Sequence, residues 1–171
     1  MTPEQASLLL NANLAAYEGE IPITRKMIAA VPEEKKDYRP HEKNMTADEL
    51  AWHIASADVW FMNSIADLNF GSPGGDRPAE TNTISGVLSW YDENVSKALA
   101  RVKAMSSEQL ATPVDFFGLF AHPAVSYLPF ANVHSVHHRG QLSVYLRPMG
   151  AKVPSIYGGS ADEPMQAAAG Q

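Results

Sequence analysis

The segment NVHSVHHRGQL at residues 132–142 contains three of the six histidines of the chain. Two of them, His134 and His138, lie four residues apart. On an α-helix this spacing places both side chains on one face, one turn above the other. Zinc-binding helices present two imidazoles to a single ion with the same spacing. We therefore predict a helix in this segment, with one face turned toward a metal site inside a bundle of helices.

The composition is that of a globular protein with one domain. A chain of 171 residues is long enough to bury a core, and contents of 45% hydrophobic and 19% charged residues exclude a disordered chain. The net charge of −6 disfavours nucleic-acid binding, which needs a basic surface. The absence of cysteine excludes disulfides, thiolate zinc sites, iron–sulfur clusters and a cysteine nucleophile.

The chain carries no signal for a membrane or for export. No apolar run approaches the roughly 20 residues that a membrane-spanning helix needs. The first residues, MTPEQ, lack the basic and then apolar order of a signal peptide. We expect a cytoplasmic protein that binds neither membranes nor nucleic acid.

Four long helices are predicted from hydrophobic periodicity and from helix-start signals. The first starts at a capping box of Thr2 and Gln5 and should kink or break at Pro22. A second capping box, TADE, occupies residues 46–49. No strand pattern survives the helical one, so the predicted class is all-α. The helices are expected at approximately residues 2–31, 46–65, 83–105 and 123–147, and a start near Pro129 is the alternative for the last one.

Three other stretches are not expected to be regular helix. Residues 69–79 contain three glycines and two prolines and should form the longest loop. Residues 113–123 are aromatic without a period, which predicts a loop that packs over the core or covers a pocket. The predicted domain is residues 1–158, and residues 159–171 are expected to form a flexible tail.

A third histidine, His53, is predicted to point into the bundle. In the second helix Leu50, Ile54, Phe61 and Ile65 mark an apolar face, and His53 lies on its edge. Sites in helical bundles are built from inward residues on facing helices. Three imidazoles and one water would make an open, reactive site, whereas a structural zinc site is closed by four protein ligands.

Simpler explanations exist for each of these histidines. Two of six histidines lie four apart by chance in many proteins. His137, three residues after His134, is an alternative to His138 as a ligand. The commoner metal-pair spacing favours His138, which also shares its face with two polar side chains further along the helix. For His53 alone, a hydrogen-bonded core histidine is the more common explanation.

One residue excludes a whole class of zinc enzyme. Zinc proteases with an HExxH motif need a glutamate directly after the first histidine as general base. Ser135 occupies that position, and no Asp or Glu occurs from Pro123 to Gly150. The same absence excludes a carboxylate-rich di-iron site, which needs Glu-x-x-His pairs on two helices.

Together these segments resemble the DinB-like proteins. The resemblance covers roughly residues 5–158, and the combination of one histidine with a later HxxxHRGQ motif is its most specific part. The matching segments are YRPH at 38–41, MTADELAWHI at 45–54, HSVHHRGQL at 134–142, YLRPMG at 145–150 and VPSIYG at 153–158.

The resemblance implies a four-helix bundle with one long crossover connection, often assembled as a homodimer. It also implies a divalent metal held by His53, His134 and His138, which decides between His137 and His138. Related proteins include thiol-dependent transferases and isomerases that use low-molecular-weight thiols, and others are described as metal-dependent hydrolases. Family membership therefore predicts the metal better than the reaction.

The leading hypothesis is a metal-dependent enzyme acting on a small molecule or a low-molecular-weight thiol. The ion would be zinc or nickel, with iron or manganese as alternatives. Gln141 and Tyr145, one and two turns beyond His138, are candidates for contacts to the ligands or to substrate. Arg139 leaves the ligand face and is expected to anchor a neighbouring helix or subunit. The alternatives are a non-catalytic metal- or ligand-binding stress-response protein and a metal-free dimeric bundle with buried histidines.

Overall fold

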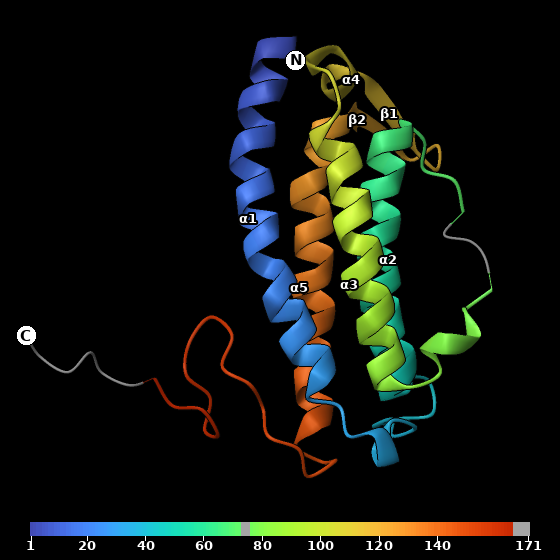
Figure 1. The fold of residues 1–171 in the computed structure, drawn as a ribbon, viewed down its shortest axis with the longest axis vertical. Helices are drawn as coiled ribbons and strands as arrows, with labels where there is room; N and C mark the ends of the chain where they lie inside the picture. The colour runs from blue at the N-terminus through green and yellow to red at the C-terminus, as the bar shows by residue number, and fades with distance from the viewer. Residues whose placement is uncertain (73–75, 166–171) are drawn as a thin grey trace, which may run out of the picture.

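The computed structural model describes residues 1–72 and 76–165, and this part of the chain is mostly helical. Four long helices lie side by side along the long axis of the molecule (Figure 1). They are α1 (Pro3–Ala29), α2 (Ala47–Asp67), α3 (Ile84–Lys103) and α5 (Tyr127–Leu146). The shorter elements are η1 (Glu33–Lys35), η2 (Ala79–Thr81), α4 (Ser107–Ala111), β1 (Pro113–Phe116), β2 (Phe120–Pro123) and η3 (Ala124–Ser126).

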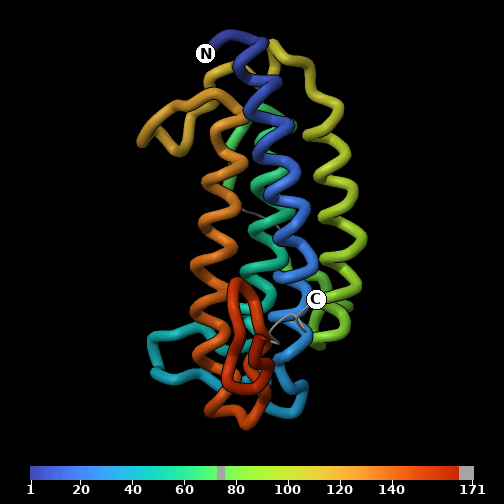
Figure 2. Tube along the Cα trace, turned by 90° about the vertical axis from the view of Figure 1, so that its left-hand side faces the viewer, coloured from blue at the N-terminus to red at the C-terminus, as the bar shows by residue number. Residues whose placement is uncertain are grey.

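The arrangement of the long helices places α2 beside α5. Helices α1 and α5 run in one direction and α2 and α3 in the other (Figure 1). Helix α2 contacts both α3 and α5, and α1 contacts α5 from the other side. Figure 2 shows the same packing after a turn of 90°, with α3 and α5 on opposite sides of the molecule. The second and fourth long helices of the sequence therefore share an interface.

Local hydrogen bonds mark the starts of α1 and α2 at the residues that the sequence predicted. The Thr2 hydroxyl accepts from the backbone N–H of Gln5, and the Gln5 side chain accepts from the N–H of Thr2 at 2.9 Å. Thr46 and Glu49 form the same reciprocal pair before α2. Each pair satisfies N–H groups that have no partner inside the helix.

Of the kink or break predicted at Pro22, the break does not occur. Helix α1 continues through Pro22 to Ala29, although proline removes one backbone hydrogen bond. Buried side chains hold both halves against the bundle, Tyr17 before the proline and Met27 and Ile28 after it. Tertiary packing on both sides offsets the local cost, which a single-sequence pattern does not contain.

The prediction that the chain has no strand is also wrong. Residues 113–123 form an antiparallel hairpin in which Val114 pairs with His122 and Phe116 with Phe120. Its turn uses the left-handed region at Phe117 (φ 56°) and Gly118 (φ 72°). The Phe116 ring packs against Phe70, with ring centroids 5.1 Å apart. Each strand has four residues, which is too few for an alternation of apolar and polar residues to be recognised in the sequence. The packing of Phe116 on Phe70 holds the hairpin in place.

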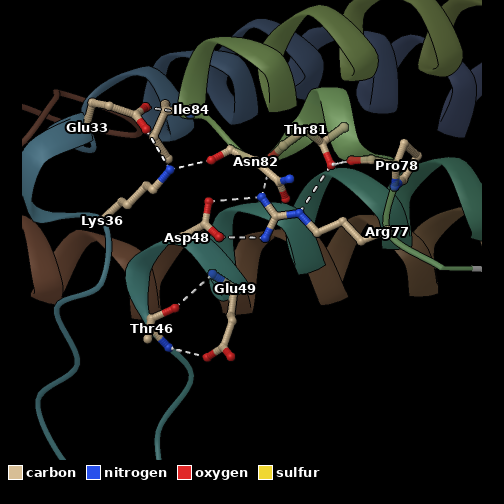
Figure 3. A network of polar contacts seen from close by, with 10 residues as sticks. All are labelled: Glu33, Lys36, Thr46, Asp48, Glu49, Arg77, Pro78, Thr81, Asn82 and Ile84. Atoms are coloured by element: carbon tan, nitrogen blue, oxygen red, sulfur yellow. Dashed lines mark hydrogen bonds and ion pairs between the residues drawn. The ribbon is translucent and has the colours of Figure 1, made fainter.

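The connection from α2 to α3 is anchored at the start of α2. Arg77 donates hydrogen bonds to both carboxylate oxygens of Asp48, at 2.5 and 2.9 Å. It also donates to the hydroxyl and the backbone carbonyl of Thr81 (Figure 3). These bonds hold residues 76–83 against the first turn of α2.

The predicted tail divides into two parts. Within residues 159–165, Glu163 forms an ion pair with Lys26 of α1, and Asp162 accepts from the backbone N–H of Val153 at 3.0 Å. These contacts join the first part to the bundle. The rest of the predicted tail, residues 166–171, lies outside the described residues. No helix in the described ranges combines the length and apolarity that crossing a membrane requires.

Candidate metal centre

Three histidines from two helices converge between α2 and α5. His53 belongs to α2, and His134 and His138 belong to α5. Each offers a ring nitrogen, and these nitrogens all lie within 4.8 Å of one another. The Nε2 atoms of His53 and His138 are 3.2 Å apart. The structure thus brings together the three residues that the sequence singled out.

The spacing of these nitrogens fits a shared ion. Ligand nitrogens about 2.1 Å from a tetrahedral zinc ion are roughly 3.4 Å from each other. The 3.2 Å between His53 and His138 is close to that value. In addition, the Nδ1 atom of His134 is buried without a hydrogen-bond partner among the described residues. A buried nitrogen without a hydrogen-bond partner lowers the stability of the fold unless a ligand or an ion binds it.

Gln141 contacts one histidine of the group, His138. Its side-chain oxygen lies 3.0 Å from Nδ1 of His138. If that oxygen accepts the Nδ1–H, the neutral ring directs the lone pair of Nε2 toward His53. Metal-binding histidines are generally oriented by such an outer acceptor.

Burial keeps the three rings neutral. It lowers the pKa of His53, and the neighbouring His138 lowers it further. Burial, assisted by the other imidazoles, lowers the pKa of His134 to about 4. For His138, burial lowers the pKa while the hydrogen bond with Gln141 opposes the shift. Because a metal binds neutral imidazole, these rings need not lose a proton to bind an ion at neutral pH.

Two other candidates lie outside the group. His137, the alternative ligand on the same helix, is exposed, and its side chain is not among the three that converge. Tyr145 is buried and packs edge-on against Tyr38, with ring centroids 6.0 Å apart. Among the described residues, no hydrogen bond or ring contact joins Tyr145 to the three histidines. The structure therefore shows no contact between Tyr145 and the three histidines, and its contact with substrate stays a prediction.

Comparison with known proteins identifies the family of this chain. The model of the DinB family matches residues 10–168. This chain belongs to the DinB family. It is 29% identical to YrdA of Bacillus subtilis over 150 residues, covering 88% of this chain and 89% of YrdA. It is 32% identical to YjoA of the same organism over 131 residues, covering 75% and 82%.

Solved structures of DinB-like proteins share the fold. A DinB-like protein from Bacillus cereus superposes with a TM-score of 0.73 at 26% identity, covering 86% of this chain and 97% of that chain. The structure of YjoA superposes with a TM-score of 0.69 at 25% identity, covering 84% and 96%.

One buried carboxylate of this DinB-family protein, Asp58, was not predicted from the sequence. Asp58 of α2 accepts hydrogen bonds from the hydroxyl of Tyr91 of α3, at 2.7 Å, and from that of Ser135 of α5. Burial raises its pKa to about 6, and the hydrogen bonds from Ser135 and Tyr91 oppose the shift. The available signal was an acidic residue on the apolar face of α2, between Ile54 and Phe61. Because Ser135 follows His134 directly, this contact holds α5 at the histidine site.

Arg139 anchors α5 to a neighbouring helix, as expected. Its side chain is buried and forms an ion pair with Glu20 of α1. It also donates to the hydroxyl of Thr24, at 3.2 Å, and to that of Tyr157, at 2.6 Å. The residue after His138 thus fixes α5 against α1 and against the segment that follows α5.

A cavity of about 660 Å³ adjoins the histidines, and His53 and His134 form part of its wall. Its volume falls in the range of small-molecule sites, roughly 300–1,000 Å³. The hairpin contributes Phe116, so part of residues 113–123 covers a pocket as the sequence suggested. All three tryptophans of the chain line this cavity. Tryptophans are more often found in a hydrophobic core or at a dimer interface.

Proposed function

We propose that this DinB-family protein is a metal-dependent enzyme in which His53, His134 and His138 hold one divalent ion. One observation carries the proposal: three neutral imidazoles from two helices converge, and two of them, His53 and His134, form part of the wall of a cavity of small-molecule size. Three protein nitrogens leave a coordination position open, as in catalytic rather than structural zinc sites. A bound divalent ion would supply Lewis acidity at that position.

The chain itself would orient the ligands and exclude water. Gln141 would hold the His138 ring in the tautomer that leaves Nε2 free to bind. The Asp58–Ser135 hydrogen bond would keep His134 at a constant distance from α2. The aromatic cavity wall would keep solvent away from the reacting group. The reaction is a thiol-dependent transfer or isomerisation, or a hydrolysis, of a small molecule in the cytoplasm, with zinc or nickel as the favoured ion.

We also propose a specific bundle type and an oligomeric state for this chain. The chain would be a four-helix bundle of the DinB type, with a long crossover from α2 to α3, and would form a homodimer. The outward face of α5 supports the dimer because Val133 and Val144 are 67% and 69% exposed. Arg139 is the sole charged residue of α5, and it is buried. An uncharged exposed helix face suits contact with a second copy of itself.

Metal analysis of untagged protein tests the metal site. We expect one divalent ion per chain in the wild type and a loss of that ion in His134→Ala. The control is His137→Ala, which removes an exposed neighbouring imidazole and should retain the ion. Wild type without stoichiometric metal, or His134→Ala with a full complement, would overturn the proposal.

Metal removal then tests catalysis. The apoprotein, reconstituted in turn with zinc, nickel, iron and manganese, is assayed for thiol transfer and for ester hydrolysis. We expect a rate in one of these reactions that appears with metal and is lost in His53→Ala. A metal that raises the melting temperature but supports neither reaction would indicate a structural ion instead.

A further inference from the structure

The cavity beside the three histidines has mostly aromatic walls. Trp52 and Trp60 come from α2 and Trp90 from α3. The rings of Trp52 and Trp90 meet at 62°, with centroids 4.7 Å apart. On the α5 side, Phe130 packs edge-on against Phe61 at 5.6 Å. A ligand in this cavity would therefore contact flat π surfaces on several sides.

The described side chains that line the cavity carry either a negative charge or no charge. Among the described residues that line it, Asp76 is the one with a charged side chain at neutral pH. It is exposed and has no ion-pair partner in the described part of the chain. Asn63, Asn94 and Ser56 add neutral polar groups. No lysine or arginine is found among the described lining residues.

The nearest arginines are already occupied. Arg77 lies over the Trp52 ring, 5.4 Å from its centroid, but its guanidinium donates to both oxygens of Asp48 (Figure 3). Arg101 donates to Asn63 at 2.7 Å and forms an ion pair with Asp67. Neither can bind a ligand anion without giving up a carboxylate.

These features select against anions. In the metal-free cavity, a carboxylate would lose its hydration, find no free cation and meet the charge of Asp76. The whole chain, with a net charge of −6, also repels anions as they approach. In contrast, tryptophan rings attract cations through their quadrupole, by about 0.5–2 kcal/mol for each good contact.

We propose that the cavity binds a small molecule with a flat apolar ring and a protonated amine, and that without a metal ion on the histidines it binds carboxylate-bearing analogues less tightly. The ring would lie among Trp52, Trp60 and Trp90, and the ammonium group would lie toward Asp76. This inference names the substrate class of the proposed enzyme. It rests on the proposed function for the reaction but not for binding, so the two can be tested separately.

The test uses metal-free protein, so that no ion can attract the anionic probe. The probes are 2-(1-naphthyl)ethylamine, 2-(1-naphthyl)ethanol and 1-naphthylacetate, which share a ring and differ in charge. Binding is followed by the three indole N–H resonances in a ¹H–¹⁵N spectrum, because all three tryptophans line the cavity. We expect the amine to bind at least about tenfold more tightly than the acid, with the alcohol between them.

A charge variant locates the ammonium group. Asp76→Asn should weaken binding of the amine by about two- to fivefold and leave binding of the alcohol unchanged. Asp37→Asn makes the same change of net charge at an exposed position outside the cavity and should alter neither. Equal weakening of both amine and alcohol by Asp76→Asn would refute the assigned position of the ammonium group.

The two proposals fail on different results. If the acid binds metal-free protein as tightly as the amine, or if no probe shifts the indole resonances, the substrate class is wrong and the metal site is untouched. If the protein carries no metal but prefers the amine, the proposed function fails and the cavity assignment stands.

Discussion

Asp58 should make the protein more stable at acidic than at neutral pH, compared with an Asp58→Asn variant. Burial raises its pKa from 3.8 to about 6 in the folded state. The folded state therefore holds the proton more tightly than the unfolded chain, and stability falls as pH rises through this window. A difference of 2.2 pKa units corresponds to about 3 kcal/mol in the free energy of unfolding. About 2 kcal/mol of that change falls between pH 4 and pH 7.

The measurement is urea unfolding of wild type and Asp58→Asn at several pH values from 4 to 7.5. Asparagine keeps the shape and can still hydrogen-bond with Tyr91 and Ser135, but it does not titrate. Other groups contribute equally to both proteins, so the difference between the two free energies isolates Asp58. We expect the wild type to lose about 2 kcal/mol relative to the variant across this range. A difference that is constant, or that grows in favour of the wild type with pH, would refute the reasoning.

A second variant separates titration from hydrogen bonding. Asp58→Ala leaves the buried hydroxyls of Tyr91 and Ser135 without their acceptor. It should destabilise the fold by about 2–4 kcal/mol at pH 4, where the wild-type carboxyl is mostly protonated. If Asp58→Ala is as stable as wild type at pH 4, the hydrogen bonds of Asp58 do not contribute as the geometry indicates.

Three further predictions concern the outer partner of His138, the exposed face of α5 and the start of α3. Gln141→Ala should weaken metal binding about 10- to 100-fold in a competition titration with a chelator, while the melting temperature of metal-free protein stays within a few degrees of wild type; unchanged metal affinity would show that Gln141 does not orient His138. Val144→Lys should convert a dimer to a monomer in sedimentation analysis without loss of helix signal, and a variant that sediments as wild type would place the dimer surface elsewhere. Gly86→Ala should lower the free energy of unfolding by about 1–3 kcal/mol, because its new Cβ would lie 1.9 Å from the carbonyl oxygen of Glu80. Gly19→Ala, with nothing within 4 Å of the added carbon, should instead be neutral or stabilising by up to about 1 kcal/mol in the same urea experiment, and equal effects at both positions would contradict the clash.

The starts of α1 and α2 and the shared helix face of His134 and His138 could be predicted because their causes are local. The capping boxes at Thr2 and Thr46 each depend on two residues three positions apart, and the structure shows both. The pairing of His134 with His138 depends on one helical turn. His53 needed one more step, its place on the edge of an apolar face, and the resemblance to the DinB-like proteins supported that step.

The features that were missed depend on several elements at once. Pro22 breaks an isolated helix, but here buried side chains on both sides of it carry α1 through. The hairpin at residues 113–123 forms because Phe116 packs on Phe70 and Tyr127. Phe70 follows α2, far from the hairpin in the chain, and Tyr127 begins α5. Such contacts have no signature within a short window of sequence.

The sequence by itself determined where α1 and α2 begin and which histidines share a helix face, because capping and periodicity act over three or four residues. Only the tertiary structure decided that Asp58 is buried among hydroxyls from two other helices, and that three tryptophans line a cavity whose described residues include one carboxylate. Desolvation and cavity shape are properties of packed elements. They arise only when α2, α3 and α5 come together, and they turn a pair of histidines on one helix into a site with a pocket beside it.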